Sequence, residues 1–254
     1  MLKSESIGTY RVFCSDKHTF GTDAVLLAHF AAVQKAKTMC DMGTGCGIVA
    51  LLALRDNEKL SCTAVDIQPP AIELVFKAVK ENSLEKRLFP VLCDIREFAH
   101  LPSGTHGLQF GSFDLVTMNP PYRKRGAGLQ TGDPEKDIAR FELACDFDDC
   151  CAAAKRLLRP GGRFCVCHRP DRLTDVLCAM RKCGLEPKRL RQVQNRAGTQ
   201  PMLILVEGIS GANPGLRLLP ALYLCDESGR ETAELKAIYA PWQYPRGEKE
   251  KTQQ

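Results

Sequence analysis

The feature that most constrains this chain is a glycine-rich turn between an apolar run and a helical run. The stretch CDMGTGCGIVALLAL spans residues 40–54 and places Gly43, Gly45 and Gly47 just after the apolar run that ends near Asp41. Glycine suits such a turn because the backbone takes positive φ angles there and lets a ligand approach closely. A strand, a tight turn and a helix in this order are typical of the ligand-binding edge of an α/β domain.

The spacing of the glycines narrows the class of ligand. A dinucleotide-binding fingerprint, G-x-G-x-x-G, requires glycine at position 48, where this chain has Ile48. In addition, the carboxylate of Asp41 would repel a pyrophosphate, whereas it suits a ligand that carries positive charge. Both observations disfavour a nicotinamide-dependent dehydrogenase.

The rest of the chain predicts an α/β fold with a doubly wound, mostly parallel, seven-stranded sheet of the Rossmann-like kind. Beyond residue 37, short apolar runs alternate with amphipathic helical stretches, which is typical of a parallel sheet covered by helices on both faces. The predicted strands are Thr38–Met42, Thr63–Ile67, Phe89–Cys93, Phe113–Met118, Arg163–Cys167, Arg189–Val193 and Met202–Val206. The predicted helices span residues 23–33, 48–54, 69–79, 137–158, 173–182 and 233–240.

Three parts of the chain follow from this pattern. Residues 1–37 form a short N-terminal cap, in which Thr22 or Asp23 is well placed to cap the first helix. Residues 38–209 form the α/β domain. Residues 210–254 form a C-terminal extension, whose run LRLLPALYLCDESG is expected to be a hairpin or a loop.

Composition excludes several classes of protein. The 254 residues include 44% hydrophobic and 26% charged residues, which is ordinary for a globular chain and excludes a disordered or fibrous one. No apolar run reaches the roughly 18 residues of a membrane span, and the N-terminus lacks a secretory signal, so we expect a cytoplasmic protein with no membrane contact. No two of the 13 cysteines stand three positions apart, so the sequence predicts buried thiols and no metal site.

Carboxylates follow the next two predicted strands. Asp66 ends the second strand, nineteen positions beyond Gly47, where a carboxylate can accept hydrogen bonds from both ribose hydroxyls. Asp94 ends the third strand, where its carboxylate can receive the exocyclic amine of an adenine. Together with Asp41, these acids surround one glycine turn at the carboxyl ends of consecutive strands.

The fourth strand runs directly into Asn119-Pro120-Pro121-Tyr122. Consecutive prolines fix φ and lack N–H donors, so the turn presents acceptors, namely the Asn119 side-chain oxygen and the Pro120 carbonyl. Two acceptors on the hydrogens of a planar amine favour its nucleophilic, pyramidal form as the transition state develops. The ring of Tyr122 offers a face on which a flat acceptor can stack. We therefore predict catalytic roles for Asn119, Pro120 and Tyr122.

These motifs resemble the class I S-adenosylmethionine-dependent methyltransferases over roughly residues 38–210. The resemblance implies that the glycine turn packs against the methionine part of S-adenosylmethionine, that Asp66 holds its ribose and that Asp94 meets its adenine. It implies no metal. The residues expected to bind this cofactor are Thr22, Asp41, Gly43, Thr44, Gly45, Gly47, Asp66, Ile67, Asp94, Ile95 and Asn119.

Two further segments resemble one family within that class. The lead-in YRVFCSDKHTFGTDAVLLAHFA at 10–31, the run at 119–128 and the Ala-Arg-Phe-Glu at 139–142 are similar to the bacterial tRNA1(Val) adenine-37 N6-methyltransferases. This resemblance implies transfer of a methyl group to the N6 amine of an adenosine in tRNA, near the anticodon. Only about 37 residues precede the cofactor motif, which counts against the glutamine methyltransferases with their sizeable helical substrate domain.

Basic residues fit an RNA substrate. Arg123, Lys124 and Arg125 flank the predicted acceptor pocket within a loop at 123–133, and a second cluster consists of Lys188, Arg189, Arg191 and Arg196. The expected partner is a tRNA substrate, and nothing in the sequence indicates an obligate protein partner. Three alternatives stay open: methylation of another RNA base amine, methylation of a protein glutamine amide, and a non-catalytic RNA-binding module.

Overall fold

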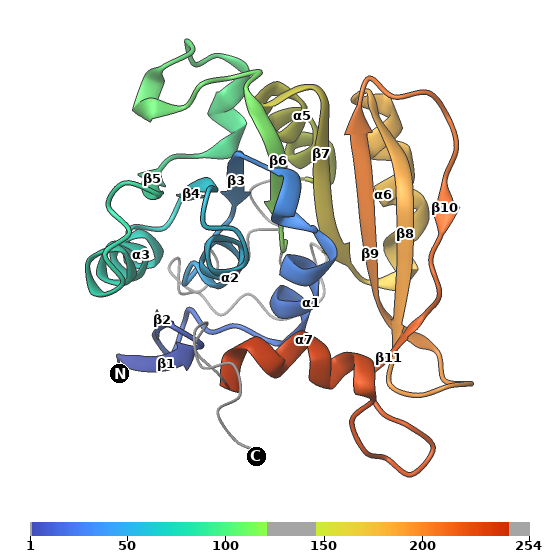
Figure 1. The fold of residues 1–254 in the computed structure, drawn as a ribbon. Helices are drawn as coiled ribbons and strands as arrows, with labels where there is room; N and C mark the ends of the chain where they lie inside the picture. Colours follow the sequence, from blue (N-terminus) through green and yellow to red (C-terminus); the bar gives the residue numbers. More distant parts are fainter. Residues whose placement is uncertain (1, 121–145, 244–254) are drawn as a thin grey trace, which may run out of the picture.

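The structure is a computed structural model, and it describes residues 2–120 and 146–243. Within these ranges, a nine-stranded sheet runs through the molecule with helices on both sides, and a two-stranded hairpin lies below it (Figure 1). The strands are β1 (Lys3–Ile7), β2 (Tyr10–Cys14), β3 (Thr38–Met42), β4 (Ser61–Asp66), β5 (Leu88–Leu92), β6 (Phe113–Met118), β7 (Leu158–His168), β8 (Leu185–Gln194), β9 (Pro201–Ser210), β10 (Arg217–Leu218) and β11 (Leu222–Tyr223). The α-helices are α1 (Thr22–Phe30), α2 (Ile48–Asp56), α3 (Pro69–Glu81), α5 (Phe147–Leu157), α6 (Leu173–Lys182) and α7 (Ala233–Gln243), and the short 3₁₀ turns are η1 (Val33–Lys35), η2 (Ile95–Ala99), η3 (Thr105–Gly107) and η5 (Pro170–Arg172).

The strand order is that of a doubly wound sheet. The strands lie in the order β10-β8-β9-β7-β6-β3-β4-β5, with β11 also beside β8. The pairs β3–β4, β4–β5, β3–β6 and β6–β7 are parallel, whereas β9 is antiparallel to both β7 and β8. The predicted α/β fold is confirmed, and the seven predicted strands are the β8-to-β5 part of this sheet. The two additional strands have two residues each, too few to show an alternating pattern in the sequence.

The sheet is buried on both faces, which explains its apolar strands. Met39 and Leu115 belong to the core that α1, α2, α3 and the β1–β2 hairpin cover. Their neighbours Cys40 and Val116 belong to the core on the opposite face, under α5 and α6. Successive side chains of a strand point to opposite faces, so a strand that is buried on both sides is apolar throughout.

Two predicted helix starts are wrong. α1 begins at Thr22 with Gly21 as its N-cap residue, and no side chain caps it, so neither Thr22 nor Asp23 has the predicted capping role. The helix predicted over 137–158 begins at Phe147 in the described residues, because Asp146 and Asp149 form a capping box that starts a new helix there. Positions 137–145 lie outside the described residues.

Both extensions pack against the α/β domain. Ile7 and Val12 of the hairpin share one core with Leu235 and Ile238 of α7, below α1 and α2 (Figure 1). The predicted hairpin or loop after residue 215 instead forms β10 and β11, which both pair in parallel with β8. The boundaries at residues 37 and 209 stay predictions.

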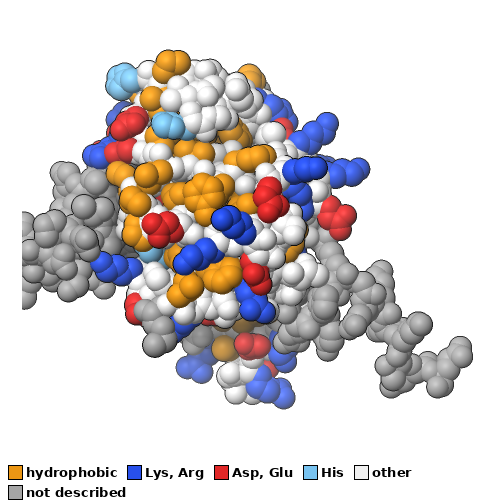
Figure 2. Space-filling view, turned by 90° about the vertical axis from the view of Figure 1, so that its left-hand side faces the viewer, with side chains coloured by type: hydrophobic (Ala, Val, Ile, Leu, Met, Phe, Trp, Pro, Cys, Tyr) orange, Lys and Arg blue, Asp and Glu red, His pale blue; other side chains and the backbone are white. Residues whose placement is uncertain are grey.

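The side of the molecule that carries α3 and the edge strand β5 has a mixed surface, where hydrophobic side chains lie among charged ones (Figure 2). Phe76, Phe89 and Leu92 are each more than two fifths exposed there. Pro90 in the middle of β5 lacks an N–H donor, which makes this edge a poor template for another strand. In the described ranges, no helix is long and apolar enough to span a bilayer.

Candidate active site

A cavity of about 350 Å³ lies at the carboxyl ends of β3, β4 and β6. The chain leaves β3 toward β4 and β5 on one side, and returns through β6 on the other side. Ligands of doubly wound sheets bind at this kind of switch in strand order, since the flanking loops turn in opposite directions and leave a crevice. The cavity therefore lies where this fold binds a ligand, and its volume is within the roughly 300–1,000 Å³ of small-molecule sites.

The glycine turn forms one wall of the cavity, but its three glycines serve two purposes. Gly43 and Gly45 line the cavity with φ angles of +64° and +56°, and a Cβ atom at Gly45 would meet nothing within 4 Å. Gly47 does not line the cavity. Its φ angle is +80°, and a Cβ atom there would lie 3.1 Å from Cγ2 of Val75. Gly47 is therefore required for the start of α2 and for the close packing of α2 on α3, and its predicted role in binding a cofactor stays a prediction.

Asp41 presents a buried carboxylate at the base of the cavity. Its two oxygens accept hydrogen bonds from the hydroxyls of Thr44 and Thr117, each at 2.7 Å. Burial raises the pKa of Asp41 from 3.8 to about 6, although both hydroxyls lower it, and the nearby Asp66 raises it further. The carboxylate is thus ionised at neutral pH in a buried position, where a positively charged ligand group would be attracted strongly.

Asp66 lies beside the turn and is also buried. Its oxygens accept hydrogen bonds from the backbone N–H groups of Gly45 and Gln68, both at 2.9 Å. Burial raises the pKa of Asp66 above its ordinary value in spite of these donors. An ionised carboxylate has about four acceptor sites, so these backbone bonds leave it some capacity to accept from a ligand hydroxyl.

Asn119 and Pro120 follow β6 and line the same cavity. The Nδ2 atom of Asn119 donates a hydrogen bond to Oδ2 of Asp23 at 3.1 Å, and the Sγ atom of Cys167 donates one to Oδ1 of Asn119 at 2.8 Å. The structure thus brings the predicted acceptor residues and the glycine turn into one cavity. Tyr122, the third predicted catalytic residue, lies outside the described residues.

Four other predicted cofactor residues are not brought to the cavity. The carboxylate of Asp94 is hydrogen-bonded to the guanidinium and the backbone N–H of Arg96, two positions further along the chain. Ile95 is buried in the core under α5, Ile67 is half-buried beside the turn, and Thr22 is exposed with its hydroxyl bonded to Tyr239. Their roles stay predictions, and for Asp94 the role requires Arg96 to release a carboxylate oxygen.

The N-terminal cap supplies cavity residues that the motif analysis missed. Lys17, His18, Phe20 and Asp23 all line the cavity, opposite the glycine turn. Burial lowers the pKa of His18, although the nearby Asp66 counteracts this shift. All four lie in the segment 10–31. The resemblance of that segment to a methyltransferase family was the sequence signal that could have pointed to them.

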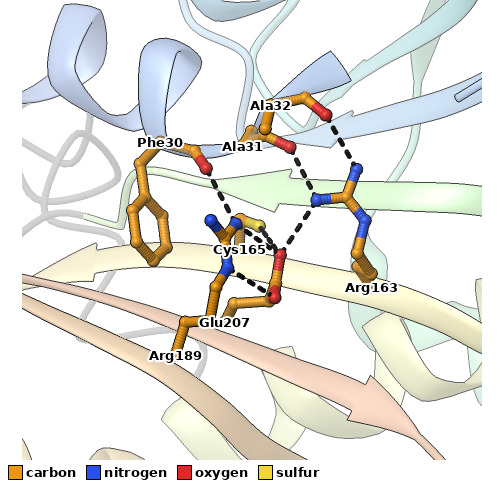
Figure 3. Close-up of polar contacts among 7 residues, drawn as sticks. All are labelled: Phe30, Ala31, Ala32, Arg163, Cys165, Arg189 and Glu207. Carbon is orange, nitrogen blue, oxygen red and sulfur yellow. Dashed lines mark hydrogen bonds and ion pairs between the residues drawn. The ribbon is translucent and has the colours of Figure 1, made fainter. Parts of the chain in front are cut away.

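Two residues of the second basic cluster, Arg189 and Arg191, form ion pairs within the protein. Glu207 of β9 lies between the guanidinium groups of Arg163 and Arg189, which come from the two strands that flank it (Figure 3). Its oxygens lie 2.9 Å from Nη1 of Arg163 and 2.7 Å from Nε and Nη2 of Arg189. Burial would raise the pKa of Glu207, but the hydrogen bonds and charges of both arginines lower it below its ordinary value.

The same arginines hold the end of α1. Arg163 donates to the carbonyls of Ala31 and Ala32, and Arg189 donates to the carbonyl of Phe30 (Figure 3). Helix carbonyls at a C-terminus lack partners within the helix, so this network attaches the N-terminal cap to the sheet. Arg191 is likewise bonded to Pro220 and Glu234. These internal partners give Arg189 and Arg191 a role within the fold, and their predicted contact with RNA stays a prediction.

Metal ligands are absent from the described part of the chain: there, no group of three His, Cys, Asp or Glu side chains is placed to hold a metal ion. The prediction that the protein uses no metal stays a prediction.

Comparison with known proteins agrees with this geometry. The methyltransferase small domain family matches residues 6–177. The chain belongs to this family. Curated relatives named tRNA1(Val) (adenine(37)-N6)-methyltransferase include one from Phocaeicola vulgatus, 33% identical over 73% of this chain and 74% of the relative, and one from Aeromonas salmonicida, 31% identical over 77% and 79%. A third, from a Flavobacteriaceae bacterium, is 36% identical, but the chain spans only 57% of its length. The resemblance found in the sequence is confirmed.

Solved structures support the fold. A predicted O-methyltransferase from Agrobacterium tumefaciens superposes with a TM-score of 0.68 at 21% identity, covering 88% of this chain and 97% of that one. A geranyl diphosphate methyltransferase in complex with SAM superposes with a TM-score of 0.53 at 14% identity, covering 74% and 84%. At these identities the likeness extends to the fold alone.

Proposed function

We propose that this protein transfers a methyl group from S-adenosylmethionine to the exocyclic N6 amine of an adenosine in tRNA, near the anticodon. The observation that carries the proposal is that Asn119 and Pro120 line the same cavity as the glycine turn and two buried carboxylates. A site for a cofactor and a site for an amine therefore adjoin. The names of the curated relatives support tRNA as the substrate and adenosine N6 as the acceptor.

The residues of the cavity fit S-adenosylmethionine. Gly45 leaves space where a side chain would otherwise fill the cavity, and its neighbour Gly43 lets the backbone approach the ligand. The ionised carboxylate of Asp41 matches the positive charge of this cofactor, and Asp66 retains acceptor capacity for ribose hydroxyls. When bound, S-adenosylmethionine supplies an electrophilic methyl group.

The chain's own residues prepare the amine. An adenine amine is a weak nucleophile because its lone pair is delocalised into the ring. The Oδ1 atom of Asn119 and the carbonyl of Pro120 accept its two hydrogens, which localises the lone pair on nitrogen as the new bond forms. Tyr122 stacks on the base and aligns it, which contributes positioning. The basic loop at 123–133 contacts tRNA phosphates, and like Tyr122 it lies outside the described residues.

The test is methyl transfer to bulk tRNA with isotope-labelled S-adenosylmethionine, followed by mass spectrometry of the nucleosides. The proposal predicts label in N6-methyladenosine. Label in another nucleoside would favour a different RNA base amine, and label in protein would favour a glutamine amide. Binding of tRNA without any transfer would favour a non-catalytic RNA-binding module.

A further inference from the structure

The side-chain amide of Asn119 is held at both ends by residues that are distant in the sequence. Its Nδ2 atom donates to Oδ2 of Asp23 at 3.1 Å, and its Oδ1 atom accepts from Sγ of Cys167 at 2.8 Å. Asp23 lies in the first turn of α1, and Cys167 lies in β7. Three elements therefore meet at the group that receives the substrate amine in the proposed function.

These two neighbours determine which end of the amide is the oxygen. The two ends of an amide are similar in size, but one only donates hydrogen bonds and the other only accepts them. An ionised carboxylate can only accept, so Asp23 selects the NH₂ end, while the thiol of Cys167 donates to the oxygen. Rotation of the amide by 180° would place Oδ1 of Asn119 against the carboxylate. An amide oxygen has two lone pairs, so it can accept from a substrate amine as well as from a thiol.

The carboxylate of Asp23 is itself closely constrained. Its Oδ1 atom accepts a hydrogen bond from the backbone N–H of Ala24 at 2.9 Å. A Cβ atom at Gly21 would lie 2.8 Å from the same oxygen. Because the φ angle of Gly21 is −122°, the backbone does not require glycine there, and its absent side chain instead leaves room for the carboxylate.

We propose that Asp23 is a positioning residue, which orients the Asn119 amide so that its oxygen faces the substrate amine, with Cys167 holding the oxygen end. This inference rests on the proposed function and adds a role for the N-terminal cap in it. It explains why the cap reaches the cavity at this point. Asp23 acts through Asn119, so its loss should have little further effect once the Asn119 amide is removed.

The deciding experiment is a double-mutant cycle with Asp23→Ala, Asn119→Ala and the double variant. Single-turnover methyl transfer is measured at saturating tRNA, and cofactor affinity and thermal unfolding are measured in parallel. Losing a preorganised catalytic hydrogen-bonding group slows an enzyme by about 10²–10³-fold, so we expect about 10–10²-fold for Asp23→Ala. In the Asn119→Ala background, we expect less than about a twofold further loss. If the fold-loss of rate in the double variant equalled the product of the two single losses, the two residues would act independently and the inference would be wrong.

Further variants separate orientation from charge and from folding. Asp23→Asn keeps an oxygen that can accept from Asn119, so it should recover part of the rate that Asp23→Ala loses. Gly21→Ala changes no charge but displaces the Asp23 carboxylate. It should therefore slow methyl transfer even when the cofactor is saturating. If Asp23→Asn were as slow as Asp23→Ala and Gly21→Ala were as fast as wild type, orientation would be the wrong account.

The contribution of Cys167 is tested against a matched buried cysteine. Cys167 and Cys40 are both fully buried in sheet strands, so replacing either by alanine removes the same atoms from the core. Only the first thiol donates to Asn119 among the described contacts, so Cys167→Ala should slow transfer more than Cys40→Ala does. Equal rates would remove Cys167 from the inference.

Failure of the proposed function can be distinguished from failure of the inference about Asp23. If wild-type protein methylates another amine, the assignment to adenosine is wrong, while the same cycle with that amine still tests the role of Asp23. If wild-type protein transfers methyl to no amine, both the function and the inference are wrong.

Discussion

Replacing Asp41 with asparagine should stabilise the protein while weakening its cofactor binding. The carboxylate is buried, and its pKa of about 6 lies above the ordinary value of 3.8. At pH 4 to 6 the unfolded chain is therefore ionised at this position, whereas the folded protein retains the proton. Folding stability falls as pH rises through this window and stays lower above it. Each pKa unit is worth about 1.4 kcal/mol, so the ionised carboxylate lowers stability by about 3 kcal/mol at pH 7.5.

Asparagine removes this penalty because it is neutral at every pH. The hydroxyls of Thr44 and Thr117 can rotate to accept as well as donate, so both ends of the new amide can find partners. The free energy of unfolding should be measured by urea denaturation under reducing conditions, for wild type and Asp41→Asn, from pH 4 to 8. Taking the difference between the two proteins cancels the titration of groups that do not interact with Asp41, while Asp66, which does, contributes to the difference. We expect the variant to be more stable by about 3 kcal/mol above pH 7 and by little near pH 4.

Cofactor binding should act in the opposite direction to this stability difference. If Asp41 faces a positive group of S-adenosylmethionine, saturating cofactor should stabilise wild type more than the variant and narrow the gap at pH 7.5. A stability difference that does not depend on pH would refute the desolvation of Asp41. Equal stabilisation of both proteins by the cofactor would refute its contact with the ligand.

Three further predictions concern single side chains. Glu207→Gln should lower the free energy of unfolding by about 3 kcal/mol at pH 7, because two partly buried guanidinium groups lose their charge partner. Since the arginines hold the pKa of Glu207 low, this difference in urea denaturation should be present above about pH 4.3 and disappear as pH falls below that. Asp66→Ala should weaken S-adenosylmethionine binding by at least about 1–3 kcal/mol in calorimetric titration, and equal affinity would remove it from the site. Gly47→Ala should lower stability by about 1–2 kcal/mol or more, since it combines positive φ with contact against Val75, whereas Gly45→Ala has only the strain of its positive φ, so it should lower stability less and weaken cofactor binding more. The reverse order of the two glycine variants would contradict the division of roles in the turn.

The sequence predicts the centre of this fold closely because both faces of the sheet are buried. Thr38–Met42, Phe113–Met118 and the helix at 173–182 have the bounds that the structure gives them. The two strands are mostly apolar and are followed by Gly43 and Asn119, so their ends are visible locally. The cavity residues Asp41, Gly43, Gly45, Asp66 and Asn119 follow from the same strand ends.

What the sequence does not reveal are contacts that no local pattern can show. Asp23 meets Asn119 across 96 positions. Arg189 looks like part of a basic surface, but the antiparallel register of β8 and β9 places it directly opposite Glu207. Gly47 belongs to the glycine turn in sequence, yet its close neighbour is a side chain on α3. Each of these residues obtains its role from tertiary packing.

The central claim is that one cavity joins the cofactor to an amine held by Asn119. The measurement that tests it most directly is the single-turnover rate of methyl transfer to tRNA for wild type and Asn119→Ala, with S-adenosylmethionine affinity measured on both proteins. We predict that the rate falls by about 10²–10³-fold, because one of the two preorganised acceptors is lost, while the variant remains folded and binds cofactor. A near-normal rate in Asn119→Ala would contradict the claim.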